Sequence, residues 1–399
     1  MYSAGEMGSF VENPNELIII DLTKPQLTTN PVSRTLRSFG GLPQRITFSE
    51  QLNLPTGLRR LLIVETDVDV SLLDLEHLDR EEITVRLTNG TTTARVEPSA
   101  IAVDPGGRTS DDWAKIAIRT KQEPSVIVLE LGPLPASDVG TVPNDYRPVV
   151  NIVGLDTVPS DIAFVTTDAG PRLAALEPNS KKAALIDTST TVTSTVDMPA
   201  DYGKLSLVTK QVGDAPAGGS DVALLWGGPS SKYAGVAFWS LGKSVGQAYR
   251  SIETLSDVGT AIKQVIDIPA PHASLKLLIP SNAAGTAPIH LLDLASRTAS
   301  PLVVSTQSLN VTVARDGQRI WLYQSGGMQA AVLSLDNYHP RNLSLSQSIA
   351  ELFDIQNQQG GRTMLALDRK GNSAATLLDA LAPDDATGQM YAGILQGGF

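Results

Sequence analysis

The residues that most often carry chemistry are sparse in this sequence. Its four histidines, His77, His272, His290 and His339, are far apart, and none lies within five residues of another. A local zinc site needs ligands at short spacing, so the histidines do not indicate one. His290 lies within the apolar run IHLLDL and is interpreted as a packed strand residue rather than a ligand or base. The phosphate-binding pattern G-x-x-x-x-G-K-[ST] and the pattern G-x-G-x-x-G are both missing.

One short stretch could hold a hard cation. The turn Glu65-Thr66-Asp67-Val68-Asp69 is rich in carboxylates, which are the ligands that calcium prefers. It lacks the glycine and the downstream glutamate of an EF-hand loop. Asp67 and Asp69 are therefore the candidate calcium ligands, and a solvated hairpin turn is the alternative. The sequence predicts no other cofactor and no catalytic residue.

Composition limits the partners. The chain has 399 residues, a net charge of −11 and no cysteine. Nucleic acid is not expected as a partner, because such binding depends on Lys and Arg neutralising phosphates. The absence of cysteine excludes disulfides and thiolate metal sites but does not identify the compartment. No apolar run of roughly 18 residues occurs, so direct membrane insertion is not expected, and the first residues do not resemble a signal peptide.

The strongest signal is a repeat. Eight apolar runs, each with a polar residue at its fifth position, start 41 to 57 residues apart. That spacing is typical of propeller blades. A short polar side chain there can accept hydrogen bonds from the backbone of the following turn. The runs are Leu17–Leu22, Val70–Leu75, Val126–Leu131, Ala183–Thr188, Val236–Leu241, Ile289–Leu294, Ala330–Leu335 and Ala375–Ala380.

Each run is preceded by a second apolar strand and a turn, as in Asp221–Leu241, which predicts an antiparallel hairpin. A further strand precedes most hairpins, such as Ser99–Asp104, and another follows, such as Ile83–Thr88. No strong helix is expected, and the best candidate for a helical turn is Ser251–Val265. Four short strands per repeat predict an all-β fold, a β-propeller of four-stranded antiparallel blades.

Eight central hairpins favour eight blades, and seven blades are expected if the N-terminal strands complete the last one. The whole chain, residues 1–399, is then a single domain. The approximate blades are residues 1–40, 41–97, 98–156, 157–200, 201–256, 257–305, 306–347 and 348–399.

These units resemble the WD40-like and YVTN-type repeats of bacterial β-propellers, in which an apolar strand ends in a short polar residue before a turn. The resemblance spans nearly the whole chain, but there is no Trp-Asp dipeptide and no literal YVTN. It implies a binding or scaffold protein of the bacterial cell envelope, periplasmic or on the surface, with a cytoplasmic location as the alternative. Some propellers of this kind are lactonases or quinoprotein dehydrogenases, so function follows from fold only by analogy.

In this architecture the turns between second and third strands share one face around the channel mouth. The sequence predicts that this face, rich in Gly, Pro, Ser and Asn, binds a protein partner. Trp226 has two interpretations, core packing or a place on this face. The expected partner-binding residues are Lys121, Lys181, Lys182, Trp226, Tyr233, Met328 and Arg369.

The first functional hypothesis is a non-enzymatic propeller that binds a protein. The rival hypothesis is a lactonase-like or other hydrolase that uses acidic residues at the channel mouth, with or without calcium. Clustered carboxylates with raised pKa values would favour the enzyme. The sequence does not indicate the oligomeric state.

Overall fold

The structure is a computed structural model in which every regular element of the described residues is a β-strand. It describes residues 16–20, 32–37, 41–88, 95–140, 142, 144–178, 180–208, 222–227, 235–241, 252–255, 258, 261–280, 289–302, 309–338, 340–356, 362–367, 375–379 and 389–391. The chain packs as two compact units, built mainly from Met1–Leu207 and from Glu253–Phe399. Within the described residues, no helix is long and apolar enough to cross a membrane.

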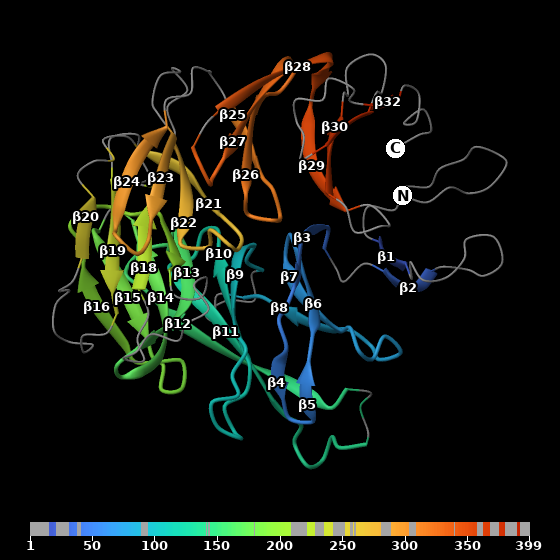
Figure 1. Ribbon diagram of the computed structural model, residues 1–399. Helices are drawn as coiled ribbons and strands as arrows, with labels where there is room; N and C mark the ends of the chain where they lie inside the picture. Colours follow the sequence, from blue (N-terminus) through green and yellow to red (C-terminus); the bar gives the residue numbers. More distant parts are fainter. Residues whose placement is uncertain are drawn as a thin grey trace. The chain divides into compact units, whose positions relative to one another are not determined.

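The first unit contains four-stranded antiparallel sheets in which consecutive strands are neighbours (Figure 1). A two-stranded sheet, β1 (Glu16–Ile20) with β2 (Val32–Arg37), comes before them in the chain. The four-stranded sheets are β3 (Pro43–Phe48), β6 (Leu61–Thr66), β7 (Asp69–Asp74) and β8 (Ile83–Arg86); β9 (Pro98–Asp104), β10 (Lys115–Thr120), β11 (Ser125–Pro133) and β12 (Tyr146–Gly154); and β13 (Asp161–Thr167), β14 (Gly170–Glu177), β15 (Lys182–Ile186) and β16 (Thr193–Asp197). The sheet β17 (Lys204–Leu207), β18 (Val222–Trp226), β19 (Val236–Ser240) and β20 (Ile252–Leu255) follows.

The second unit repeats the same strand order. Its four-stranded sheets are β21 (Ile262–Asp267), β22 (Leu275–Pro280), β23 (Ile289–Asp293) and β24 (Thr298–Leu302); β25 (Leu309–Val313), β26 (Arg319–Gln324), β27 (Gly327–Ser334) and β28 (Pro340–Ile349); and β29 (Glu351–Gln356), β30 (Arg362–Leu367), β31 (Ala375–Asp379) and β32 (Gln389–Tyr391). Four antiparallel strands joined in sequence order form the unit that β-propellers repeat.

Two details differ from the sequence-based expectation. An extra hairpin, β4 (Leu52–Leu54) with β5 (Gly57–Arg59), is inserted between β3 and β6. The expected helical turn at Ser251–Val265 is wrong at both ends of that segment, where β20 and the start of β21 form strands. Ile252 and Ile262 begin strands there because both β-branched side chains suit a pleated, half-buried surface.

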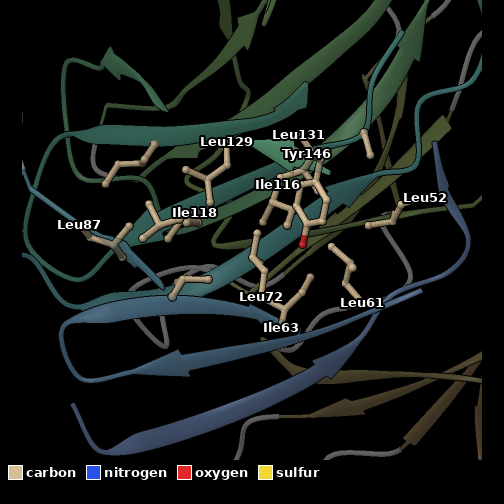
Figure 2. Packing of buried hydrophobic residues seen from close by; sticks show 14 of the residues in the cluster. Leu52, Leu61, Ile63, Leu72, Leu87, Ile116, Ile118, Leu129, Leu131 and Tyr146 are labelled. Atoms are coloured by element: carbon tan, nitrogen blue, oxygen red, sulfur yellow. The ribbon is translucent and has the colours of Figure 1, made fainter. Parts of the chain in front are cut away.

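Side chains on both faces of a sheet are buried, which explains the continuous apolar runs. In β10 and β11, Ile116, Ile118, Ile127 and Leu129 face one cluster, which includes Leu61, Ile63 and Leu72 of the preceding sheet (Figure 2). The alternate residues, Ala117, Val126 and Val128, face a second cluster with Phe164 and Leu173 of the following sheet. Each shared cluster therefore joins two sheets that are consecutive in the chain.

The second unit packs by the same rule. In β26, Ile320 and Leu322 join a cluster with Leu277 of the sheet before it. Trp321 points to the opposite face and packs with Met364 of the sheet after it. The indole of Trp321 is fully buried, and its Nε1 has no hydrogen-bond partner within the described part of the chain.

The polar fifth positions have the structural role expected from the sequence at three described sites. Asp74 Oδ1 accepts hydrogen bonds from the N–H groups of residues 76 and 77 at 2.9 and 3.2 Å. Asp187 Oδ1 accepts from residues 189 and 190 at 2.9 and 3.3 Å. Asp293 Oδ1 accepts from residues 295 and 296 at 2.8 and 3.4 Å. The prediction is confirmed at these sites, while Asp21 and the side chain of Asp379 lie outside the described residues.

We expect Trp321→Ala and Trp321→Phe to separate two contributions to stability. Truncation to alanine removes the ring from the cluster and should lower the free energy of unfolding by about 3–5 kcal/mol. Phenylalanine keeps most of the packing and removes an unpaired N–H whose burial costs about 1–3 kcal/mol, so its net effect should stay below about 1.5 kcal/mol. Urea unfolding followed by circular dichroism measures both variants. Equal losses for the two would mean that the indole N–H has a partner.

Candidate functional site

Antiparallel strands in sequence order give each sheet two different ends. The turn between the second and third strands lies at the end where the first strand begins, and we call this the turn end. The first–second and third–fourth connections lie at the opposite end. The predicted partner-binding residues that the structure describes lie at the turn ends of several sheets, so each unit is described by its own turns.

Hydrogen bonds fix the backbone of the turn after β10, and the side chain at its tip is exposed. Thr120 is buried, and its Oγ1 accepts a hydrogen bond from Glu123 N at 3.3 Å. The backbone N–H of Lys121 donates to the carbonyl of Glu97 at 3.0 Å. The Lys121 side chain is 53% exposed and forms an ion pair with Glu97. The turn thus presents a lysine from a fixed backbone.

The turn after β14 is held in a similar way. Lys181 has a positive φ of 53°, and its N–H donates to Asp201 Oδ1 at 3.0 Å. Ser180 Oγ donates to the carbonyl of Glu177 at 2.7 Å. Lys182 Nζ lies 3.7 Å from Asp156 Oδ2. Both predicted lysines therefore lie at a turn end of the first unit, next to acidic groups.

In the second unit, Met328 lies near the start of β27, just after the turn between β26 and β27. The N–H of Gly326 donates to Ile349 O at 2.7 Å, and Ser325 Oγ donates to Ala350 O at 3.3 Å. Gly326 has a φ of 81°, which a residue without a Cβ adopts at low cost. Met328 is 51% exposed although it is apolar. The backbone below this side chain is therefore fixed while its tip remains in solvent.

The placement of Trp226 on the partner-binding face is wrong. Its side chain is buried within β18, and its backbone carbonyl accepts a hydrogen bond from the N–H of Gly203 at 3.1 Å. Burial of the apolar indole in the packed sheet is energetically more favourable than its exposure to solvent. Packing was the other interpretation of Trp226 and is the one observed. Tyr233 and Arg369 lie outside the described residues.

The acidic turn between β6 and β7 is not solvated throughout. Thr66 Oγ1 accepts hydrogen bonds from Val68 N at 3.2 Å and Asp69 N at 2.8 Å, and Asp67 Oδ1 accepts one from Leu42 N at 2.8 Å. Asp69 is only 1% exposed, and its Oδ1 has no hydrogen-bond partner within the described part. The expectation of a solvated turn is therefore wrong at Asp69, because this residue is the first of β7 and its side chain is buried in the sheet.

The charges around Asp69 act in two directions. Burial raises the pKa of its carboxyl group, and the nearby charges of Arg95 and Arg86 lower it. The charge of Asp67 raises it again. Asp67 and Asp69 are two carboxylates at one turn, and the described residues contain no group of three or more acidic, histidine or cysteine side chains arranged to hold a metal ion.

Glu65 is the most enclosed acid at this turn end. Burial raises the pKa of its carboxyl group, and Arg45, whose Nη1 lies 3.6 Å from Glu65 Oε1, lowers it. The same Nη1 donates to Ser99 O of the next sheet at 3.2 Å. Glu65 pairs with Val70 in the β6–β7 register, so it lies on the opposite face of the hairpin from Asp69.

A third acid with a raised pKa, Glu177, belongs to another sheet. Burial raises its pKa, and the backbone N–H of Thr157, which donates to Oε2 at 3.1 Å, lowers it. Three carboxyl groups of the first unit thus have raised pKa values, but Glu65, Asp69 and Glu177 lie on different sheet faces. The clustering that would favour an enzyme is therefore incomplete.

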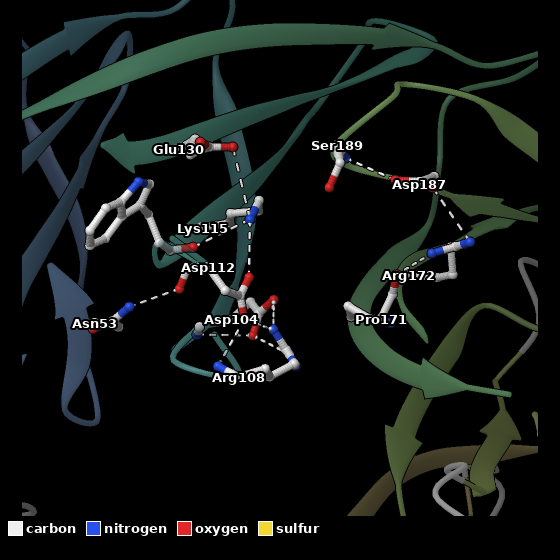
Figure 3. A network of polar contacts seen from close by, with 12 residues as sticks. Asn53, Asp104, Arg108, Asp112, Lys115, Glu130, Pro171, Arg172, Asp187 and Ser189 are labelled. Carbon is white, nitrogen blue, oxygen red and sulfur yellow. Dashed lines mark hydrogen bonds and ion pairs between the residues drawn. The ribbon is translucent and has the colours of Figure 1, made fainter. Parts of the chain in front are cut away.

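Cations and acids pair closely at the opposite end of the sheets (Figure 3). Arg108 donates to Asp104 Oδ1 and to Asp112 Oδ2 at 2.7 Å each, and Lys115 Nζ lies 3.6 Å from Asp112 Oδ1. Asn53 of the inserted hairpin donates to the Asp112 carbonyl at 2.9 Å. These contacts tie the loop before β10 to the inserted β4–β5 hairpin, which is a structural role.

The inserted hairpin carries a second network of this kind. Arg59 is buried and donates to Asp74 Oδ2 and to Asp145 Oδ1, both at 2.9 Å. Arg80 Nη1 lies 2.7 Å from Asp145 Oδ2. Burial alone would raise the pKa of Asp145, but hydrogen bonds from Arg59, Thr56 and Arg80 hold it well below its usual range. The charges compensate one another, and the network joins the inserted hairpin to β7 and to the loop before β12.

Sequence reasoning missed several of these residues. Arg59 and Asp145 are 86 positions apart, and no local pattern links them. A second omission concerns a motif. Gly242-Lys243-Ser244-Val245-Gly246 fits the spacing G-x-S-x-G of hydrolase nucleophile turns and follows β19, although it lies outside the described residues. The pattern requires a strand, a turn and a helix around the serine, and only the strand is observed.

Comparison with known proteins supports the fold. No protein-family model matches the chain, and no curated protein matches it by sequence. A solved structure of dihydro-heme d1 dehydrogenase NirN in complex with DHE is similar with a TM-score of 0.50 and 13% identity, over 95% of this chain and 71% of that chain. Hydrazine synthase from Kuenenia stuttgartiensis has a TM-score of 0.40 at 12% identity, over 71% of this chain and 76% of that one. BBS1N in complex with ARL6DN has a TM-score of 0.43 at 11% identity, over 82% of this chain and 89% of that one.

The NirN similarity covers nearly the whole chain and agrees with the strand order of the sheets. The fold is therefore an all-β propeller of four-stranded antiparallel sheets. At this identity the similarity carries no activity or ligand to this chain.

We expect Glu65→Gln to stabilise the protein increasingly as pH rises. A carboxyl group with a raised folded-state pKa contributes stability that is complete below its unfolded pKa of about 4.3 and is lost as pH rises through the folded value. The melting temperature of Glu65→Gln should equal that of the unmodified chain near pH 4 and exceed it by on the order of 1–2 °C at pH 7. Glu76→Gln changes an exposed carboxyl group and is the control. A constant difference at all pH values would contradict the assignment.

Proposed function

We propose that this chain is a non-enzymatic β-propeller module that recognises a protein partner through its turn ends. The observation that carries the proposal is the combination of fixed turn backbones with exposed tips. Lys121 lies in such a turn, and Lys182 and Met328 lie at the start of the strands that follow such turns. The N–H groups of residues 121, 123, 181 and 326 in these turns are already paired. A preorganised surface loses little conformational entropy on binding, so more of the contact energy remains as affinity.

The chemistry of these tips suits a protein surface. Methionine is enriched at interfaces and adapts to irregular apolar surfaces, so Met328 is the proposed anchor of the second unit. Lysines act best at a solvated rim, which is the proposed role of Lys121, Lys181 and Lys182 in the first unit. An acidic or mixed partner surface would match these lysines, since their nearest partners in the chain are carboxylates.

The finer parts of the proposal come from the resemblance to bacterial WD40-like and YVTN-type repeats. These are a single ring of residues 1–399, a place in the bacterial cell envelope and the absence of catalysis. They remain predictions, as does the number of blades. A binding role for the fold is compatible with the cell envelope and with the cytoplasm.

A capture experiment with matched variants tests the partner-binding role. The immobilised chain captures proteins from an extract, and the captured partner is then purified and titrated. Met328→Asp should weaken its binding at least about tenfold, which corresponds to about 1.4 kcal/mol. Lys121→Glu combined with Lys182→Glu should slow association, because rim charges steer encounter.

Two control variants place the same change at the opposite end of a sheet. Val192→Asp lies between β15 and β16, and Tyr338→Asp lies between β27 and β28; both side chains are exposed. Both controls should bind as the unmodified chain does. Equal binding by all variants, or equal loss in the controls, would contradict recognition through the turn ends.

One observation favours the second candidate function, a lactonase-like or other hydrolase that depends on calcium. Asp69 has a buried carboxylate oxygen without a hydrogen-bond partner in the described part of the chain, and such groups are commonly paired with a cation. The raised pKa values of Glu65, Asp69 and Glu177 agree with acid–base chemistry. The positive charges of Arg86 and Arg95 near Asp69 oppose a cation there and make this the weaker proposal.

A thermal-shift titration tests the calcium site. The chain is treated with EDTA and then titrated with calcium into the millimolar range. A site at Asp67 and Asp69 should raise the melting temperature in a saturable way, since the ion binds only the folded state. Asp69→Asn should abolish the rise, whereas Asp79→Asn, at an exposed acid of the same sheet, should not. A melting temperature that calcium does not change would remove this candidate.

A further inference from the structure

The first four-stranded sheet of the first unit has one apolar face that is partly open. Phe48 and Ile46 lie on β3 and pair with Leu62 and Val64 of β6, so all four side chains share one face of the sheet. Leu73 of β7 lies beside them. We call these five residues the Phe48 face. Phe48 is 70% exposed and Ile46 is 44% exposed.

This face differs from the other apolar faces in its packing. The clusters that contain Leu129, Phe164, Leu277 or Trp321 each take residues from two consecutive sheets. The cluster on the Phe48 face takes its described members from one sheet and the residues just after β7. An exposed phenylalanine beside buried leucine and valine is typical of a surface that another element covers.

The chain contains a strand pair that is suited to cover the Phe48 face. The strand pair β1 (Glu16–Ile20) and β2 (Val32–Arg37) lies immediately before β3, and only residues 38–42 connect Arg37 to Pro43. In the other apolar clusters, the sheet that covers a face is the previous or the next sheet along the chain. The run Leu17–Ile20 is apolar at every position, which is the pattern of a strand buried on both faces. An isolated two-stranded sheet is marginally stable in water, so β1–β2 needs such a surface as much as the Phe48 face needs a cover.

We propose that the strand pair β1–β2 packs on the Phe48 face and forms the first layer of the sheet series. Burial of the Phe48 ring would remove its exposed apolar surface from water, which favours this packing. The connection of residues 38–42 is long enough, because a sheet-to-sheet spacing of about 10 Å requires only three or four extended residues.

Cysteine accessibility in the full-length chain tests the proposal, because the sequence contains no cysteine. Phe48→Cys and Leu58→Cys are made separately; Leu58, on β5, is 58% exposed and lies off this face. Their rates of reaction with a maleimide are compared. The thiol at position 48 should react at least about tenfold more slowly than the thiol at position 58. The combined substitutions Ile18→Asp and Ile19→Asp in β1 should then raise the rate at position 48 to that at position 58.

A third thiol reports whether the sheet stays folded. Val70→Cys lies on the opposite face, where Val70 is fully buried, and should remain unreactive in the presence of both β1 substitutions. A fast reaction at position 48 in the otherwise unmodified chain overturns the proposal. A slow reaction that the β1 substitutions leave unchanged also overturns it and assigns the cover to another element of the chain, or to a second copy if the rate depends on concentration.

Discussion

A sheet with apolar side chains on both faces must be covered on both faces, and this constraint governs the whole structure. Ile118 and Ala117 are neighbours in one strand, yet they belong to different clusters on opposite sides. Trp321 and Ile320 repeat this division in the second unit. The sheets β9–β12 and β25–β28 therefore each depend on the sheet before and the sheet after them in the chain. A strongly exposed apolar side chain on a four-stranded sheet, such as Phe48, therefore indicates a face that needs a covering element.

The same constraint leaves the strand ends as the places where polar groups accumulate. At the ends with first–second and third–fourth connections, charges pair in two separate networks, in which Arg59 binds Asp145 and Arg108 binds Asp112. At the turn ends, the backbone is paired while tips such as Lys121 and Met328 remain exposed. The first arrangement uses its polar groups to hold the fold, and the second leaves them for recognition.

Local sequence pattern predicts this fold well, because strands and turns are local features. The apolar runs identified the central hairpins, and the acids at Asp74, Asp187 and Asp293 accept the turn N–H groups as expected. Contacts between distant residues left no local signal, so the Arg59–Asp145 pair was missed. The inserted β4–β5 hairpin is local but consists of two strands of only three residues, and it falls outside the repeat pattern. Composition alone did not distinguish a buried tryptophan from an exposed one, and Trp226 was misplaced for that reason.

The acids that close the third–fourth turns have a consequence for the history of the chain. Each aspartate accepts hydrogen bonds from residues two and three positions later, within its own repeat. A duplicated repeat thus carries the means to form its own turn and needs only an apolar face on either side. Gene duplication could lengthen such a series one unit at a time, and the sequences of the units could then diverge, as long as the short acceptor and the alternating apolar pattern survived.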